Sequence, residues 1–375
     1  MEVIGIIAFG TAFVITIIGV VLVKRLALFL GFLDKPGERK MHTNPIPLGG
    51  GVAIFLGVFL TLFLAVISAV FLYHYSPNSL PFVKYEDLQG VINTLTRLTV
   101  IFVGGLGIFF LGLFDDIKRL SPAIKLSFQI LIALWLVINN INLSLWAESY
   151  LAWGEYLAYL ATIIWVVVIT NSFNLLDHMD GLSAGVTAVV SAIFLTAALQ
   201  TGQYFIAYFL LIILGATLGF LVFNIHPASI FMGDTGSLLL GYLMAVLTII
   251  FTFYKEAYPL YSLFVPLLVL AVPLFDTISV VIIRIKNHQP IFKGDMNHLA
   301  HRLIGLGMGQ RSAVFTIYLL TLGTGLPAVL LYLVNKNSAV LAAIIIFIQV
   351  ILILIIITLL ENAGRKNPAK AGPTI

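Results

Sequence analysis

Long apolar runs recur along the whole chain and restrict it to one class of fold. Crossing the hydrocarbon of a bilayer takes about 20 helical residues, and eleven apolar runs approach or exceed that length. They lie at residues 3–23, 48–73, 98–114, 123–139, 153–173, 183–199, 204–223, 236–253, 259–283, 312–334 and 339–360. Only 10% of the 375 residues are charged, against about a quarter in soluble domains. The predicted fold class is therefore all-α: a polytopic integral membrane protein with about 11 transmembrane helices.

The first run is predicted to be a transmembrane helix and not a cleavable signal. No positive charge precedes it, while Lys24 and Arg25 follow it, which is the reverse of a secretory signal. The chain has no cysteine, which excludes disulfides, thiolate metal sites and cysteine nucleophiles. Residues 1–360 are interpreted as a single membrane domain, and residues 361–375 as a cytoplasmic tail.

The distribution of Lys and Arg orients the chain, because the cytoplasmic loops of membrane proteins carry an excess of both. With the N-terminus outside, sixteen of the 20 basic residues fall in inner segments and four in outer ones. The C-terminus is then cytoplasmic. The predicted cytoplasmic loops are about 24–47, 115–122, 174–182, 224–235 and 284–311.

Five aspartates stand at the ends of apolar runs, on the predicted cytoplasmic side. They are Asp115, Asp116, Asp177, Asp180 and Asp234. Carboxylates beside hydrocarbon are costly and need an explanation. Their common side indicates a metal and phosphate site at the inner membrane surface. The main alternative is a secondary transporter, whose charges belong near the bilayer midplane; a non-catalytic lipid-binding scaffold is a further one.

Asp115 and Asp116 close the third apolar run. Carboxylates at that position meet the unfavourable negative end of the helix dipole. A bound cation would remove both the dipole conflict and the repulsion between the two side chains. The alternative reading is an ordinary solvated helix end.

Segment 171–185 carries Asn174, Asp177 and Asp180 at intervals of three residues. This spacing predicts that they lie along one face of a helix, where three polar side chains beside a membrane span would make a binding surface. The alternative is a polar loop in which Asp180 and Gly181 form a turn.

Asp234 lies where the eighth run begins, among the small residues Gly233, Thr235, Gly236 and Ser237. Small residues let backbone amides approach a phosphate, and a helix N-terminus favours an anion. The aspartate itself would supply an oxygen ligand for Mg²⁺. The alternative reading is an N-cap for the eighth helix.

Basic residues precede the second run, where Arg39, Lys40 and His42 stand just before a glycine-rich helix start. They are predicted to bind anionic groups, and their alternative reading is the ordinary positive-inside signal.

A second polar cluster lies in the loop 284–311, where His298 and His301 are spaced by three residues beside Arg302. Phosphate contact or proton handling is predicted for it. Zinc is disfavoured because neither a cysteine nor a third histidine lies nearby in the sequence. Asp276, within the ninth run, is predicted to be structural and paired with a polar neighbour in the bundle.

Five motifs together resemble one enzyme family. The segments are RKMHTNPIPLGG, GLFDDIK, NSFNLLDHMDGLSAG, FNIHPASIFMGDTGSLLLG and HLAHRL. They resemble the polyprenyl-phosphate N-acetylhexosamine-1-phosphate transferases, glycosyltransferase family 4, over about residues 34–311. The first and last segments, and eleven spans, are most similar to the WecA/TagO-like branch.

The resemblance implies a reaction and its partners. An N-acetylhexosamine 1-phosphate group, with GlcNAc 1-phosphate as the expected one, would be transferred from a UDP-sugar to polyprenyl (undecaprenyl-type) phosphate. UMP would be released, and the lipid-linked sugar would start the assembly of a cell-envelope glycan. Mg²⁺ is the implied cofactor, with Mn²⁺ as a substitute. A phospho-MurNAc-pentapeptide transferase of the same family is the alternative. The family also implies a multi-pass protein of the inner (plasma) membrane with a cytoplasmic active site, a homodimer, and no nucleic-acid partner.

The resemblance assigns roles residue by residue. Asp234 matches the metal-binding aspartate, and Asp115 and Asp116 match an acidic pair that coordinates metal or activates the acceptor phosphate. With His301 these form the expected catalytic set. The expected substrate-binding residues are Arg39, Lys40, His42, Lys125, Asn174, Asp177, Asp180, Asn224, Phe231, His298 and Arg302.

Among these residues, Asn224 and Phe231 match positions that line the uridine pocket, while Lys125 and Arg302 match phosphate contacts. A lipid phosphate monoester is already largely ionised at neutral pH. Direct attack is therefore favoured, with Asp115 tuning the protonation of the acceptor. A covalent aspartyl-phosphate route stays open.

The chain departs from the family pattern at two positions that bear on sugar preference. Many members read H-x-H-H where this chain has His298, Leu299, Ala300 and His301. Glycine often follows the first aspartate of segment 171–185, but His178 stands here.

Overall fold

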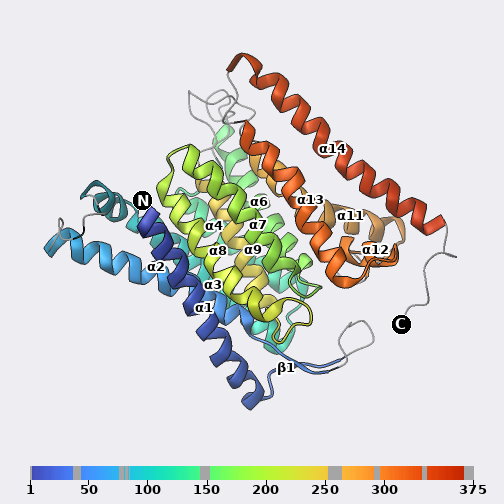
Figure 1. The fold of residues 1–375 in the computed structure, drawn as a ribbon, viewed down its shortest axis with the longest axis horizontal. Helices are drawn as coiled ribbons and strands as arrows, with labels where there is room; N and C mark the ends of the chain where they lie inside the picture. The colour runs from blue at the N-terminus through green and yellow to red at the C-terminus, as the bar shows by residue number, and fades with distance from the viewer. Residues whose placement is uncertain are drawn as a thin grey trace.

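The computed structural model describes residues 2–36, 44–75, 80, 83, 85–143, 153–251, 264–290, 296–331 and 336–366. These residues form an α-helical bundle with one short pair of strands (Figure 1). The helices are α1 (Glu2–Leu30), α2 (Gly50–Tyr75), α3 (Tyr85–Lys118), α4 (Pro122–Ile138), α6 (Gly154–Leu176), α7 (Leu182–Gln200), α8 (Tyr204–Asn224), α9 (Gly233–Ile250), α10 (Val265–Val269), α11 (Ala271–Lys286), α12 (Leu299–Gly305), α13 (Gln310–Leu330) and α14 (Lys336–Lys366). The predicted all-α class is confirmed.

Each predicted apolar run coincides with helix, but not every run is one long helix. Within the described residues, nine helices are long and apolar enough to cross a membrane. Helix α4 has 17 residues, which reach about 25 Å at ~1.5 Å per residue, short of the ~30 Å hydrocarbon thickness. The described part of the ninth run divides at Leu270 into α10 and α11.

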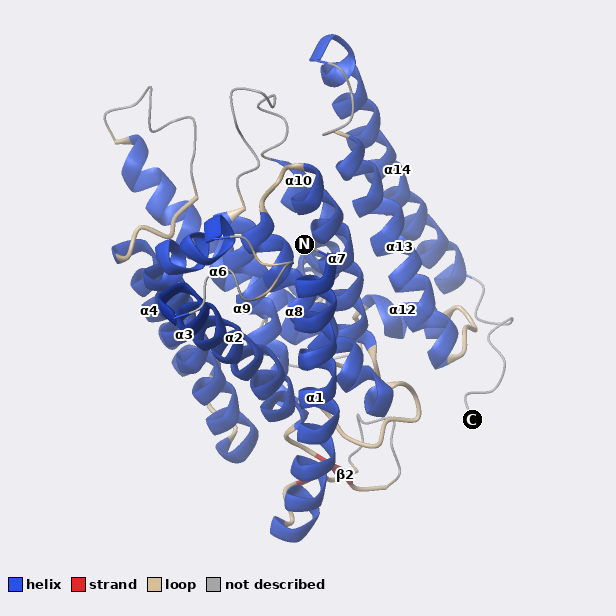
Figure 2. Ribbon diagram, turned by 60° about the vertical axis from the view of Figure 1, so that its left-hand side comes forward, coloured by secondary structure: helices blue, strands red, loops and turns tan. Residues whose placement is uncertain are grey.

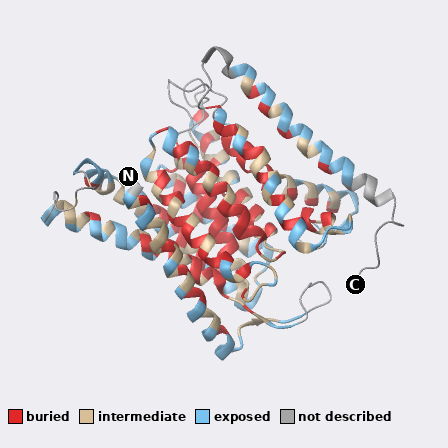
Figure 3. Ribbon diagram, in the orientation of Figure 1, coloured by how far each residue is buried: buried red, intermediate tan, exposed pale blue. Residues whose placement is uncertain are grey.

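Helix α9 is the centre of the bundle. It packs against α2, α3, α6 and α7, and its residues from Thr235 to Ile249 are buried without a break. Figure 3 shows the buried residues concentrated in this central group, while α14 at the edge is largely exposed. A helix that is apolar on all sides belongs in the interior, and a peripheral one turns its apolar surface to lipid.

Glycines let α2 and α3 approach the start of α9 very closely. A Cβ atom added at Gly51 would lie 2.2 Å from the backbone nitrogen of Gly236, and one at Gly112 would lie 2.5 Å from the carbonyl oxygen of Asp234. Any larger residue at either position would push the helices apart. The acidic end of α3 therefore lies directly against the N-terminus of α9.

The connection between α1 and α2 closes over the same end of the bundle (Figure 2). Strand β1 (Leu33–Asp34) pairs antiparallel with β2 (Ile46–Pro47). The carbonyl of Pro47 accepts the N–H of Phe231 at 2.9 Å, and the carbonyl of Phe231 accepts the N–H of Gly50, also at 2.9 Å. These bonds fasten the α1–α2 connection to the loop before α9.

Candidate active site

A cavity of about 1100 Å³ opens at this end of the bundle, and all five predicted aspartates line it. The α1–α2 connection, the end of α3, the α6–α7 loop, the α8–α9 loop and α12 contribute to its wall. Other predicted site residues on the wall are Asn224, Phe231 and His301. These residues, which come from separate elements of the chain, thus line one cavity.

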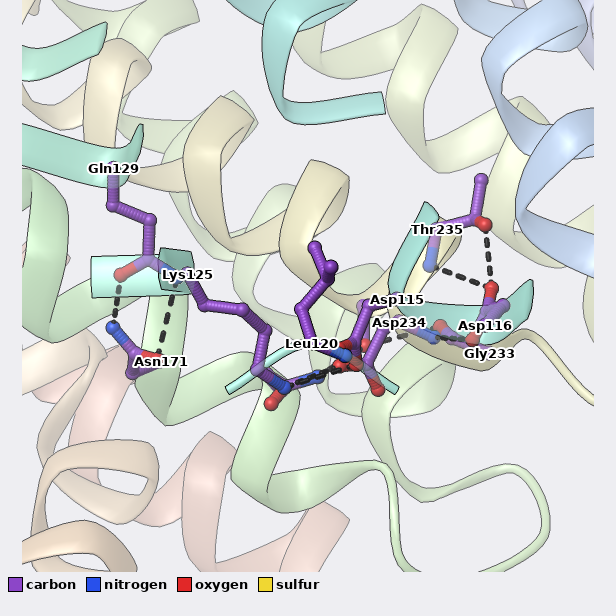
Figure 4. Close-up of polar contacts among 11 residues, drawn as sticks. Asp115, Asp116, Leu120, Lys125, Gln129, Asn171, Gly233, Asp234 and Thr235 are labelled. Atoms are coloured by element: carbon purple, nitrogen blue, oxygen red, sulfur yellow. Dashed lines mark hydrogen bonds and ion pairs between the residues drawn. The ribbon is translucent and has the colours of Figure 1, made fainter. Parts of the chain in front are cut away.

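Lys125 joins two of the aspartates from a third helix (Figure 4). Its Nζ lies 3.0 Å from Oδ2 of Asp115 on α3 and 2.8 Å from Oδ2 of Asp234 on α9. The other carboxylate oxygen of Asp115 accepts the backbone N–H of Leu120 at 2.7 Å. Ser121 caps α4 by accepting the N–H of Ile124, which starts the helix one turn before Lys125 and aims its side chain at the aspartates.

Asp116 has a different set of partners from its neighbour. Its Oδ1 accepts the backbone N–H of Asp234 at 2.7 Å. Its Oδ2 accepts the N–H of Thr235 at 3.0 Å and the Thr235 hydroxyl at 2.5 Å. Asp116 thus caps the N-terminus of α9 from another helix, a role normally taken by a residue of the helix itself.

Gly233 makes this cap sterically feasible. Its φ of +72° lies in the left-handed region, which glycine enters without a Cβ penalty. A Cβ atom there would meet Oδ2 of Asp116 at 2.5 Å. The glycine next to Asp234 therefore serves both the backbone turn and the close approach of a carboxylate.

The arrangement resolves the dipole conflict at the end of α3. The carboxylate of Asp116 lies at the positive end of α9, where negative charge is stabilised. Asp115 is stabilised instead by the Lys125 ammonium and the Leu120 amide. Neither α3 carboxylate is a simple solvated helix end.

The donor set fits a divalent cation. Asp115 and Asp234 direct carboxylate oxygens at one shared ammonium, so the protein already converges two hard oxygen ligands on a positive charge. Mg²⁺ characteristically binds through one or two carboxylates together with substrate phosphates. Asp115 and Asp234 are thus the two carboxylates whose geometry suits that ion, while the oxygens of Asp116 accept bonds from α9.

The prediction that Asp177 and Asp180 continue a helical face is wrong. Helix α6 ends at Leu176, and Asp177 is its C-cap, donating its N–H to the carbonyl of Asn174 at 3.1 Å. Asp180 lies in the following turn, and its Oδ2 is hydrogen-bonded to Nδ1 of His226 at 2.7 Å. The left-handed Gly181, with a φ of +76°, completes the turn before α7, so the loop brings both carboxylates to the cavity.

Asp177 lies among like charges. Its burial, and then the carboxylates of Asp234, Asp116 and Asp180, raise the pKa of Asp177 well above its usual value. Burial and neighbouring negative charges both disfavour an ionised carboxylate. The cavity is therefore short of positive charge, and a cationic ligand would relieve it.

Two asparagines connect the elements around the cavity. Asn174 donates to the hydroxyl of Ser237 on α9 at 2.9 Å. Asn224 accepts the N–H of Gly181 and donates to the carbonyl of Ile230, both at 2.9 Å. Asn224 is buried and fixes the α6–α7 loop relative to the α8–α9 loop.

Asp276 is buried and paired, as predicted. Its Oδ2 accepts the Nδ1 of His298 at 2.9 Å, and its Oδ1 accepts the N–H of Leu299 at 2.5 Å. Arg302 donates to Ser279 at 2.7 Å and lies over the ring of Phe275. Arg302 and His298 thus bind α11, whereas His301 reaches the cavity wall.

The predicted site residues and the residues of the cavity wall are not the same set. Arg39, Lys40 and His42 lie outside the described residues. Two histidines on the wall, His178 and His226, were not among the predicted site residues. Both lie within the recognised motifs, so their positions were visible in the sequence while their contacts were not.

The chain is similar to known membrane transferases over most of its length. Residues 98–252 match the model of "Glycosyl transferase family 4". The chain is 36% identical over 353 residues to the "Probable undecaprenyl-phosphate N-acetylglucosaminyl 1-phosphate transferase" of Bacillus subtilis, covering 92% of this chain and 90% of that protein. It is 31% identical over 334 residues to the "Decaprenyl-phosphate N-acetylglucosaminephosphotransferase" of Mycobacterium tuberculosis, covering 82% and 78%.

A third relative is the "Undecaprenyl-phosphate alpha-N-acetylglucosaminyl 1-phosphate transferase" of Escherichia coli, at 24% identity over 316 residues, covering 82% of this chain and 78% of that protein. The fold and the cavity define a polytopic helical membrane protein with an acidic site at one end of its bundle. The chain belongs to glycosyl transferase family 4, among the polyprenyl-phosphate N-acetylglucosamine-1-phosphate transferases.

Proposed function

We propose that this protein transfers N-acetylglucosamine 1-phosphate from UDP-N-acetylglucosamine to a polyprenyl phosphate and releases UMP. Family membership and the names of the relatives support this reaction. The observation that carries the proposal is the cavity whose wall holds five aspartates, two of them joined by one lysine.

The reaction is a phosphoryl transfer between two anions. An oxygen of the lipid phosphate forms a bond to the phosphorus next to the sugar, and the bond from that phosphorus to the oxygen of UMP breaks. Positioning and neutralisation of charge therefore account for most of the catalysis. Mg²⁺, with Mn²⁺ as a substitute, would be held by Asp115 and Asp234 and would neutralise the diphosphate of the donor.

The chain's own residues supply the remaining functions. Lys125 places an ammonium between Asp115 and Asp234, where it would be close enough to contact a phosphate oxygen of a substrate. Asp116 holds the α9 N-terminus in position, and so places Asp234. Asp177 and Asp180 lie on the cavity wall with Asn224 and Phe231, where they would contact the nucleotide.

Direct attack by the lipid phosphate fits this geometry best. Asp115 is engaged by both an ammonium and a backbone amide, which lowers its reactivity as a nucleophile. Its role is to set the protonation state of the acceptor phosphate. Trapping a phosphorylated Asp115 would establish the covalent route in its place.

The topology proposed with this function has eleven spans, an outer N-terminus and a cytoplasmic C-terminus. The bias of Lys and Arg supports it. Each of the eleven runs contains helix, and among the described residues nine of them hold a helix long enough to cross a membrane. The cavity would then open to the cytoplasm from the plasma (inner) membrane, where nucleotide sugars are available. A homodimer is proposed from the family alone.

Release of UMP from UDP-N-acetylglucosamine by the purified protein tests the proposal. The expected result is release that requires both Mg²⁺ and polyprenyl phosphate, with other UDP-sugars, including the muramyl-pentapeptide donor, used more slowly. Proton-coupled uptake into liposomes without UMP release would overturn it in favour of a transporter.

A further inference from the structure

Three histidine rings form a stack between the α6–α7 loop and α12. The ring of His178 lies 4.5 Å from that of His298 and 5.0 Å from that of His301, each inclined by 28°. His178 and His301 both line the cavity. The stack joins residues more than 100 positions apart in the chain, and His178 contacts both of the other rings.

The hydrogen bonds of His178 define which of its ring nitrogens carries the proton. Nδ1 lies 2.8 Å from the carbonyl of Leu175, and a carbonyl can only accept, so Nδ1 carries the hydrogen. Burial of the ring, with His298 beside it, lowers the pKa of His178 to about 3. The ring is therefore neutral, and Nε2 is an acceptor.

This acceptor has a buried position that calls for a ligand. Among the described residues, Nε2 of His178 is buried and meets no hydrogen-bond partner. An unsatisfied buried acceptor is costly, and such an atom in a native protein calls for an explanation, of which a bound ligand is one. The residue His178 also lines the cavity, so its unsatisfied acceptor lies close to the space that a ligand would occupy.

A metal ion is a poorer explanation of the same cluster. In the described part of the chain, His178, Asp276 and His298 are close enough to hold an ion. However, both carboxylate oxygens of Asp276 already accept hydrogen bonds, one from the ring of His298 and one from the backbone N–H of Leu299. A guanidinium nitrogen of Arg302 also lies 3.8 Å from Oδ1 of Asp276. A cation would have to break these bonds and lie beside that positive charge.

We propose that His178 is a specificity-determining residue for the donor: its ring orients His301 on the cavity wall, and its Nε2 accepts a hydrogen bond from an N–H or O–H group of the nucleotide sugar. The inference rests on the proposed function. It concerns one of the two positions at which the chain departs from the family pattern, His178.

Two variants separate the two roles of the ring. His178→Gly removes both the stacking surface and the acceptor, and should raise the KM for UDP-N-acetylglucosamine about tenfold with little change in kcat. His178→Phe keeps a ring but lacks the acceptor, and should raise it about threefold.

A binding measurement locates the group that His178 recognises. If Nε2 contacts the sugar, His178→Phe lowers the affinity for UDP-N-acetylglucosamine and leaves the affinity for UMP unchanged. If it contacts the uracil or ribose, both affinities fall. His288→Gly is the matched control, because His288 is exposed and has a φ of +52° that suits glycine; its kinetics should not change.

The outcomes distinguish this inference from the function on which it rests. An unaltered protein that releases no UMP defeats the proposed function. If the unaltered protein is active, and His178→Gly retains the same KM and the same affinities at an unchanged unfolding temperature, His178 has no role in donor recognition. If only His178→Phe has an unchanged KM and unchanged affinities, the proposed hydrogen bond to Nε2 is wrong and the stacking role of the ring is retained.

Discussion

Two walls of the cavity use carboxylates in opposite ways. The acidic wall is the group of Asp115, Asp116 and Asp234, which line the cavity, together with Lys125, which contacts two of them. The histidine wall is the group of His178 and His301, which line the cavity, together with His298, which stacks on His178, and Asp276, which contacts His298. In the histidine wall, Asp276 is fully buried and accepts bonds from its own neighbours. In the acidic wall, two carboxylates share a single ammonium. The histidine wall is electrostatically complete, whereas the acidic wall has negative charge left over.

This difference separates carboxylates with a structural role from carboxylates that are available to bind a cation. A buried charge with satisfied partners stabilises the arrangement around it and has little capacity for another ligand. Surplus carboxylate charge favours binding of a cation. Asp276 belongs to the first kind, and Asp115 and Asp234 to the second. Burial alone would have ranked Asp276 first. Whether a carboxylate has to share its cationic partner with another carboxylate is the better guide to function.

Replacement of Asp234 by Asn should have the largest effect on activity. The variant removes a carboxylate from the proposed metal site, and UMP release should fall on the order of 10³-fold with the unfolding temperature near that of the unaltered protein. Asp87→Asn, at the exposed start of α3, is the matched control. Near-normal turnover in the Asp234 variant would remove it from the metal site.

Lys125→Met comes next, with an expected loss on the order of 10²-fold in kcat. The ammonium and the metal ion share the oxygens of Asp115 and Asp234, so its removal should lower the Mg²⁺ concentration needed for half-maximal activity. Lys125→Arg retains the charge and should be less impaired. A Mg²⁺ titration of all three proteins checks this, and a rise in the Mg²⁺ requirement of the Met variant would contradict the shared site.

Asp116→Asn should affect stability as well as activity. An amide presents an N–H₂ group to the N–H groups that begin α9, so we expect the protein to lose about 1–3 kcal/mol of unfolding free energy. Activity should fall about tenfold, because Asp234 moves with its helix. Thermal unfolding of this variant beside Asp115→Asn measures the difference. Equal unfolding temperatures would show that Asp116 does not act as a cap.

Asp276→Asn should have the smallest catalytic effect. It weakens the contact that orients His298, and should raise the KM for the donor about threefold while the Mg²⁺ dependence is unchanged. Steady-state kinetics at several Mg²⁺ concentrations provide the measurement. A shift in Mg²⁺ dependence would place Asp276 in the metal site and break the distinction between the two walls.

Much of the fold was predictable because lipid imposes it. A backbone in hydrocarbon must satisfy its own hydrogen bonds, so apolar runs become helices, and each of the eleven runs contains helix. The sequence was less informative where segments are short. The ninth run divides at Leu270, and the polar stripe after Asn174 leaves the helix at Leu176, because the spacing of polar residues does not locate a helix end.

The sequence by itself determined the class of protein and the identity of the acidic residues, since long apolar runs and costly carboxylates leave few alternatives. Only the tertiary structure decided how those residues divide their roles. Asp115 and Asp116 are adjacent, yet one meets Lys125 and the other meets the start of α9. His178 likewise joins the rings of α12. The physical reason is that successive side chains of a helix or turn point in different directions, and their partners come from elements far away in the chain.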